Sequence, residues 1–259
     1  MIWLAAFLLA AAAAEHYTRA NAYFGQQRFT EAEAELVAAL HEDPNLVAAL
    51  TLKGKLAMAL NRFDEAREAF VRAGELQPKS AYVQFLLGFF YYVDNDFQKA
   101  IPALEIARQL NPNDSRAVFY LALSQDGLGA ADAAVPLYEK TIELEKSGGH
   151  PTPDVHVAYA RLLFSLGRYE DAEKQVMLAL GLDPKSRDAH YELGRLWFEK
   201  GEFAKAAAEG EIALAIPGVG TLDRQIHFLL ARSYAKAGRK DLADYHLAKF
   251  KAAGVSLRR

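Results

Sequence analysis

The stretch QPKSAYVQFLLG, residues 77–88, holds a proline, a short polar turn and an apolar run that ends in a glycine. The same pattern occurs at DPNLVAALTLKG (43–54), NPNDSRAVFYLA (111–122) and DPKSRDAHYELG (183–194). Proline interrupts a helix, and Ser, Asp or Asn before an apolar run is typical of a helix N-terminus. Each stretch therefore predicts the end of one helix and the start of the next.

The small residue that closes each stretch recurs along the chain at a nearly fixed spacing. The steps are 34 residues in four of six cases, with one step of 38 and one of 37. The members of this series are Ala20, Gly54, Gly88, Ala122, Ala160, Gly194 and Ala231. A period of this length predicts a solenoid, in which helix pairs stack because no single pair can cover its own apolar faces.

The third repeat carries the fullest set of markers: Leu87, Gly88, Tyr91, Ala100, Leu104, Ala107 and Pro112. In these residues the chain resembles the tetratricopeptide repeat (TPR) family, and seven such repeats span residues 13 to about 250. The resemblance implies an all-α fold, a right-handed α-solenoid (superhelix) of about seven TPR-type helix-turn-helix repeats. It also implies a protein that binds other proteins rather than an enzyme.

The fourth repeat departs from the pattern, with Gln125 and Thr141 at marker positions and no closing proline. It leads into SGGHPTPD, residues 147–154, where glycines and prolines accompany the longest step. Such residues favour a loop, and we expect a flexion point there. The expected organisation is repeats one to four in 15–146, an inserted loop at 147–153, and repeats five to seven with the C-terminal end in 154–259.

Residues 1–14, MIWLAAFLLAAAAA, are apolar throughout and end in small residues before Glu15. They are too short for a spanning helix and fit a secretory signal peptide with an A-x-A cleavage site. No Lys or Arg precedes the apolar run, so an apolar helix that packs on the end of the fold is the alternative. The first interpretation predicts an exported protein, periplasmic or secreted, and the second a cytoplasmic one.

Composition and motifs limit the function further. A formal net charge of −3 supplies no global basic field for nucleic acid, and the absence of cysteine excludes thiolate metal sites. No phosphate loop, H-E-x-x-H or G-x-S-x-G motif is present. Four histidines at equivalent places in their repeats favour packing over metal binding: His16, His156, His190 and His227. We therefore expect no enzyme, metal, cofactor, nucleic-acid partner or stable membrane span.

The resemblance also places residues on a concave groove, since the first helix of each TPR pair lines that surface. In repeats one to four these residues are Tyr17, Asn21, Phe24, Lys55, Tyr82, Phe85, Phe89, Tyr92, Arg116 and Phe119. In repeats five to seven they are Arg161, Phe164, Tyr191, Arg195, Phe198, Phe228 and Arg232. Two features result: aromatic residues centred on the third repeat, and an arginine at one place in three successive repeats.

Each feature has two interpretations. The aromatic residues, Phe89 above all, form either an exposed patch for a partner or packing between repeats. The three arginines either contact an extended acidic peptide or pair with acids nearby in the sequence, namely Asp154, Asp188 and Glu192.

We predict an adaptor or scaffold that holds another protein or an extended, acidic peptide in the groove. Chaperone binding is not expected, because Tyr17 stands where the chaperone-binding members of the family have a lysine. Two alternatives remain open. One is a structural part of a larger, cell-envelope assembly that contacts partners through the convex face or the solenoid ends, and the other is a homo-oligomer formed through those ends.

Overall fold

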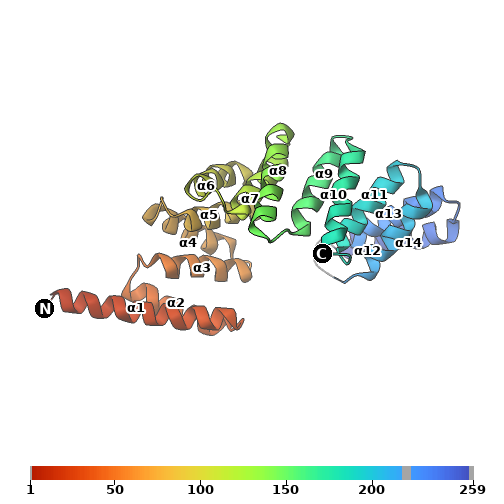
Figure 1. Cartoon of the computed structure of the whole chain (residues 1–259). Helices are drawn as coiled ribbons and strands as arrows, with labels where there is room; N and C mark the ends of the chain where they lie inside the picture. Colours follow the sequence, from red (N-terminus) through yellow and green to blue (C-terminus); the bar gives the residue numbers. More distant parts are fainter. Residues whose placement is uncertain (1, 218–222, 257–259) are drawn as a thin grey trace. The chain divides into compact units, whose positions relative to one another are not determined.

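The computed structural model describes the backbone of residues 2–217 and 223–256 and the side chains of residues 10–217 and 223–252. These ranges contain fourteen α-helices and no strand (Figure 1). The first seven helices are α1 (Ile2–Gly25), α2 (Phe29–Glu42), α3 (Val47–Ala59), α4 (Phe63–Leu76), α5 (Ala81–Val93), α6 (Phe97–Leu110) and α7 (Ser115–Gly127). The other seven are α8 (Ala131–Gly148), α9 (Pro153–Ser165), α10 (Tyr169–Leu182), α11 (Arg187–Glu199), α12 (Phe203–Ala215), α13 (Asp223–Lys236) and α14 (Lys240–Ser256).

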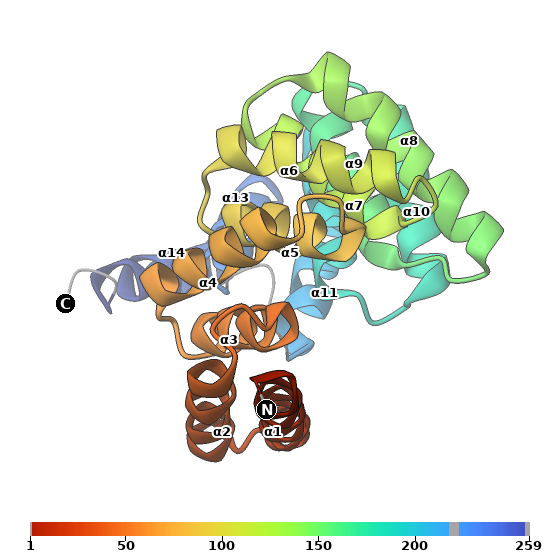
Figure 2. The same ribbon diagram turned by 90° about the vertical axis from the view of Figure 1, so that its left-hand side faces the viewer.

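The fourteen described helices form seven consecutive pairs, which confirms the predicted all-α solenoid of seven helix-turn-helix repeats. In six of these pairs, all but α7 with α8, the two helices pack against each other, as Figure 2 shows for the antiparallel α1 and α2, which are seen there nearly end-on. The polar turns quoted above cap the next helix at three of the four stretches. Ser80, Asp114 and Ser186 each accept a hydrogen bond from a backbone N–H of the first turn, while Leu46, the residue before α3, has no side chain that could accept one.

The turn inside every pair contains one residue with a left-handed backbone. Four glycines have φ between 72° and 77°, and three larger residues in the first repeats have φ between 57° and 59°. These residues are Gln27, Asn61, Asn95, Gly129, Gly167, Gly201 and Gly238. Glycine adopts this conformation without steric cost and asparagine tolerates it, so the turn ends the first helix at the same place in each repeat.

The helix pairs are grouped in two compact units, residues 1–137 and 138–259, and the division falls within α8. In the first unit the largest fully buried side chains include Phe70, Phe90 and Leu104. In the second unit they include Tyr138 and Leu196.

The inserted loop lies within the second unit, between the end of α8 and the start of α9 at Pro153. Gly149 has a φ of 74°, which a residue with a side chain rarely adopts. The Glu145 carboxylate accepts hydrogen bonds from the backbone N–H of Thr152 at 2.8 Å and from its hydroxyl at 3.0 Å. These bonds tie the loop back onto α8. Flexion at 147–153 stays a prediction.

Residues 2–14 of the N-terminal segment are continuous with the first repeat, because α1 runs from Ile2 to Gly25 without a break. The side chains of residues 1–9 lie outside the described residues, so the signal-peptide interpretation stays a prediction. Among the residues that the structure does describe, no helix combines the length and the apolarity needed to cross a bilayer.

Glycines at the aligned position let the two helices of a pair approach closely. A Cβ on Gly54 would lie 2.6 Å from the ring of Phe70, and one on Gly88 would lie 2.5 Å from Cγ of Leu104. Both large side chains come from the second helix of the same pair and are fully buried. The second helix therefore fills the space that the glycine leaves on the first helix.

We expect Gly88→Ala to destabilise the protein by about 1–3 kcal/mol, because the added methyl group overpacks the contact with Leu104. Gly181→Ala is the matched control, since a Cβ on Gly181 of α10 would meet no atom within 4 Å. There the gain in helix propensity should stabilise by about 0.5–1 kcal/mol. Chemical denaturation measures both changes. Stabilisation by both substitutions would show that the helices of the third pair are not held at their closest approach.

Candidate functional site

The first helices of three successive pairs in the second unit enclose an open pocket of about 330 Å³. We name it the α9–α13 pocket. Its lining residues are Phe164, Tyr191, Arg195, Phe198, Glu199, Phe228, Leu229 and Arg232. Six of these eight residues were predicted from the sequence, and Glu199 and Leu229 were not. The pocket lies on the surface that first helices present, which is where the resemblance placed a partner.

Two arginines of the pocket lie over aromatic rings of the preceding first helix. The Arg195 guanidinium carbon is 4.0 Å from the ring centroid of Phe164, and that of Arg232 is 4.3 Å from the centroid of Phe198. Arg232 is also 5.5 Å from the centroid of Phe228. Each such contact contributes about 0.5–1 kcal/mol at an exposed site. In repeats five to seven, the predicted arginines and the predicted phenylalanines therefore belong to one set of contacts.

The three aligned arginines differ in their acidic partners. Arg161 donates to Glu192 at 2.7 Å and to Asp188 at 2.9 Å, both on α11, and Arg195 donates to Glu192 at 2.6 Å. Glu192 is only 2% exposed. The ion-pair interpretation therefore describes Arg161 and Arg195, with Asp188 and Glu192 as the acids.

Arg232 makes no ion pair within the described part of the chain. Arg195 has its acid, Glu192, three residues earlier in the same helix. The residue three positions before Arg232 is Leu229, which cannot form an ion pair. Its guanidinium keeps its hydrogen-bond donors available over two phenyl rings at the edge of the pocket. Burial raises the pKa of Tyr191, so the phenol beside these arginines remains protonated and is a further donor.

The first unit has a comparable pocket of about 250 Å³ on α1, α3 and α5. Tyr17, Asn21, Lys55 and Tyr82, all predicted from the sequence, contribute to its lining. The Lys55 ammonium donates a hydrogen bond to the Tyr82 hydroxyl and lies 5.1 Å from the centroid of the same ring. Lys55 is thus already engaged by an aromatic residue of the next repeat.

Of the predicted aromatic residues of the third repeat, Phe85, Phe89 and Tyr92 are packed against other rings, whereas Tyr82 is 45% exposed. Phe85 is 7% exposed and lies against Phe89, whose ring centroid is 4.7 Å from that of Tyr120 in an edge-to-face contact. Tyr92 also contacts Tyr120, with 5.2 Å between the centroids. Sequence reasoning missed Tyr120, which links these rings. The sequence did contain an indication of it, because Tyr120 is an aromatic residue at the position where the preceding repeat has Leu86.

The remaining predicted residues also make contacts within the protein. Phe24 packs on Phe29, with ring centroids 5.9 Å apart. The ring centroid of Phe119 lies 5.7 Å from that of Tyr120. Arg116 binds Asp114 through two hydrogen bonds, of 2.9 and 2.7 Å, and these hold the pKa of the Asp114 carboxyl below its ordinary value.

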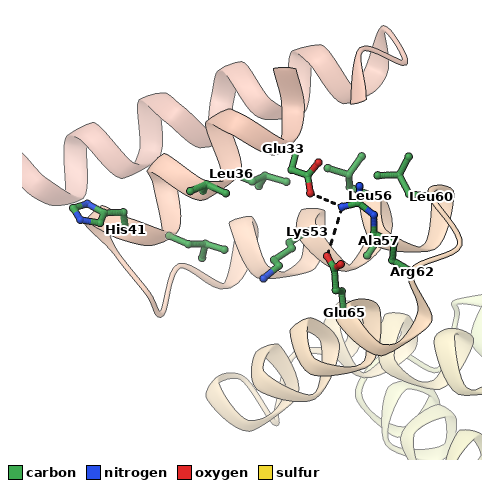
Figure 3. Close-up of a pocket in the computed structure, with 11 residues that line it drawn as sticks. Glu33, Leu36, His41, Lys53, Leu56, Ala57, Leu60, Arg62 and Glu65 are labelled. Atoms are coloured by element: carbon green, nitrogen blue, oxygen red, sulfur yellow. Dashed lines mark hydrogen bonds and ion pairs between the residues drawn. The ribbon is translucent and has the colours of Figure 1, made fainter. Parts of the chain in front are cut away.

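A groove of about 360 Å³ lies on the other side of the first unit, among α2, α3 and α4 (Figure 3). Its lining is mainly apolar, and Val37 at its edge is 66% exposed. Arg62 lines one side of the groove and forms two ion pairs there. Its Nη1 lies 2.5 Å from Glu33 Oε1 and 3.8 Å from Glu65 Oε2. We name it the outer groove. Its lining residues are Glu33, Leu36, Val37, Leu40, His41, Lys53, Leu56, Ala57, Leu60, Arg62 and Glu65.

The outer groove was not predicted, although the sequence holds a signal for it. Leu40 of the first repeat stands where the second repeat has Gly74, and Lys53 of the second repeat stands where the third has Leu87. Between the second and third repeats, Leu87 packs 3.2 Å from the position of a Cβ on Gly74. The larger leucine and the charged lysine are not compatible with the same close packing between the first and second repeats.

Metal binding finds no support in the region for which side chains are described. No group of three or more His, Asp or Glu side chains there is arranged to hold an ion. The four equivalent histidines instead each hydrogen bond to the second helix of their own pair.

Comparison with known families agrees with this fold. Models of the tetratricopeptide repeat match residues 23–88, 91–151 and 157–218, which together are more than half of the chain. The chain therefore belongs to the tetratricopeptide repeat family. Repeats of this family serve in general as non-enzymatic scaffolds for protein–protein interaction.

Individual relatives are distant in sequence. A TPR repeat-containing protein of Treponema pallidum (strain Nichols) is 22% identical over 204 residues, which are 79% of this chain and 23% of that protein. The chain thus spans less than a quarter of that relative's length. A tetratricopeptide repeat protein from Parabacteroides merdae superposes with a TM-score of 0.75 over 93% of both chains at 18% identity. Pseudomonas aeruginosa pilF gives a TM-score of 0.67 over 78% of this chain and 90% of its own, at 21% identity.

Glu192 tests whether the first two arginines have a structural role. We expect Glu192→Gln to destabilise the protein by about 1–3 kcal/mol, because it removes the buried charge that Arg161 and Arg195 share. The figure is below that for a fully buried pair, since both arginines are partly exposed to solvent.

Glu143→Gln is the control in the same unit, because the Glu143–Lys140 pair is exposed and should contribute less than about 0.5 kcal/mol. Urea denaturation of the two variants compares them directly. If the Glu192→Gln and Glu143→Gln variants were equally stable, the ion pairs of Glu192 with Arg161 and Arg195 would not contribute to the stability of the fold.

Proposed function

We propose that this protein is an adaptor that binds a segment of another protein on its first-helix surface, with the α9–α13 pocket as the principal contact. The observation that carries the proposal is Arg232. This arginine has no acidic partner among the described residues and lies over Phe198 and Phe228 at the edge of an open pocket.

The chemistry of the pocket favours a ligand with one carboxylate beside an apolar side chain. A guanidinium forms strong, charge-assisted hydrogen bonds to a carboxylate, and the rings beneath it offer an apolar surface. Glu199 also lines the pocket and would repel a second acid placed near it. We therefore propose an extended segment with a single acidic residue at this position rather than a continuous acidic run.

The sequence-based interpretation had all three aligned arginines contact one acidic peptide, whereas the present proposal assigns the contact to Arg232. Arg161 and Arg195 hold Glu192, so a peptide carboxylate would have to compete with a buried internal partner for them. Arg232 meets no such competition from Glu192. Binding energy should therefore be concentrated on α13 and its aromatic neighbours, as it is at most protein interfaces, where a few residues dominate.

A second candidate function is assembly through the second helices. It is favoured by the outer groove with exposed Val37, and by Met177 and Leu178 of α10, which are 55% and 52% exposed. Exposed apolar side chains of this size are typical of contacts with other proteins. On this proposal the partner would contact the outer surface and leave Arg232 uninvolved.

Selection from a displayed library of random peptides tests the first candidate and does not require the natural partner to be identified. We expect enriched peptides with Asp or Glu beside an apolar residue, and at least a tenfold weaker affinity for Arg232→Ala, the loss for one charge-assisted contact. Arg239→Ala removes an equal charge from the exposed turn after α13 and should bind as the wild type does. Equal binding by all three proteins, or equal loss in both variants, would contradict the proposal.

Val37→Lys separates the two candidates. It places a charge at the edge of the outer groove, on a side chain so exposed that folding should be unaffected. If an isolated natural partner is lost by Val37→Lys and retained by Arg232→Ala, the outer surface is the site of function. The opposite result would support the α9–α13 pocket.

A further inference from the structure

Four repeats share one hydrogen bond between their two helices. A histidine on the first helix contacts, through Nδ1, the residue nineteen positions later on the second helix. The pairs are His16 with Glu35 at 2.6 Å, His156 with Gln175 at 2.7 Å, His190 with Glu209 at 2.7 Å, and His227 with His246 at 2.9 Å. The contact is the same in geometry, but its partner is a carboxylate twice, an amide once and a second imidazole once.

The partner decides how each contact responds to acid. A protonated histidine gains an ion pair with Glu35 or Glu209, and it can still donate to the amide oxygen of Gln175. Two imidazoles can share the bond only while one Nδ1 donates and the other accepts. If both Nδ1 atoms carry protons, two N–H groups and two positive charges face each other at the distance of one hydrogen bond.

The surroundings of His246 set the starting state of the last pair. His246 is 3% exposed, and its Nε2 lies 3.1 Å from a Glu211 carboxylate oxygen, so Nε2 carries hydrogen and donates. The Nδ1 of neutral His246 is then the acceptor, and His227 Nδ1 is the donor. Tyr234 donates to the same Glu211 carboxylate at 3.2 Å.

Charged groups on all three helices α12, α13 and α14 face the pair. Burial and the neighbouring His246 lower the pKa of His227, Asp223 raises it, Lys249 lowers it and Glu211 raises it, in decreasing order of size. Glu211 can balance one proton on the pair, because it then forms an ion pair with His246. A second proton on the pair would remain uncompensated by that carboxylate.

We propose that the His227–His246 pair is an acid-sensitive latch that holds α13 to α14 at neutral pH and releases the two helices when both rings are protonated. The histidine contacts of the first and sixth repeats contain no such pair of imidazoles, because the partner there is a glutamate carboxylate. Acidification thus loosens one helix pair of the solenoid selectively. Since α13 also carries Phe228 and Arg232, release would remove one side of the α9–α13 pocket, a consequence that rests on the proposed function.

The direction of the pH effect follows from proton binding. Above the ordinary histidine pKa of about 6.5 both states are neutral and the pair contributes nothing that depends on pH. Below it the unfolded segment binds two protons while the folded pair binds fewer, so stability falls as pH falls. For each proton that the folded pair binds fewer than the unfolded segment, the equilibrium constant for opening rises by at most about tenfold per pH unit of acidification.

Hydrogen exchange of the full chain at pH 7.5 and pH 5.5, expressed as protection factors, tests the latch without any partner. We expect protection in α13 and α14 to fall by about tenfold or more at the lower pH. Protection in α9 and α10, whose histidine bonds to Gln175, should stay unchanged between the two values. Equal protection of α13 and α14 at both pH values would overturn the proposal.

Variants copied from other repeats supply the controls. His246→Gln reproduces the fifth repeat and should reduce the acid-induced loss, because the partner of His227 then carries no charge, and His246→Glu reproduces the first and sixth repeats and should reduce it further. If His246 variants fold poorly, His227→Gln serves instead, because Gln84 occupies that place in the third repeat. A loss of protection in His246→Gln or His227→Gln as large as in the wild type would contradict the latch.

Discussion

The close approach of the two helices within each pair is the constraint on which the rest of the structure depends. In the second and third pairs a glycine at the aligned position of the first helix receives a large side chain of the second, as Gly88 receives Leu104. This contact fixes both the distance between the two helices and their offset along the axis. Side chains nineteen residues apart meet in the same way in four of the pairs, and the first helices present equivalent positions to their neighbours.

That constancy explains how cation–ring contacts recur along the first-helix surface. Arg116 lies over Phe85 and Arg195 over Phe164, and both pairs are 31 residues apart. Arg232 and Phe198 make the same kind of contact across the longer step between the sixth and seventh repeats. What differs among the arginines is the acid beside them. Asp114 and Glu192 neutralise two of them, whereas Leu229 stands where the third would have its acid.

The fold was predictable because its determinants are local and repeated. Proline, polar caps, turn glycines and the aligned small residues each recur at the same spacing, so errors in one repeat are corrected by the others. The positions on the first-helix surface came from the resemblance to the tetratricopeptide repeat family. The state of each side chain did not, because it depends on one neighbour: Arg232 differs from Arg195 through the single change from Glu192 to Leu229.

Features that arise from departures between repeats were harder to foresee. The outer groove exists where Leu40 and Lys53 replace residues that pack closely between the second and third repeats, and periodicity carries no information about such mismatches. Tyr120 was missed for the same reason, since a leucine stands at its place one repeat earlier.

Differences between equivalent positions of the repeats also guide the proposals about function. A position that makes one contact in every repeat is structural by default, because the fold requires that contact each time. Function becomes available where a repeat keeps the position and changes the partner. Arg232 keeps its ring while a leucine replaces the acid, and His227 keeps its hydrogen bond while the partner changes from carboxylate to imidazole. The two retained residues, Arg232 and His227, both lie on α13, so one helix combines a cation that no acid in the described residues neutralises with one ring of the histidine pair proposed to respond to protons.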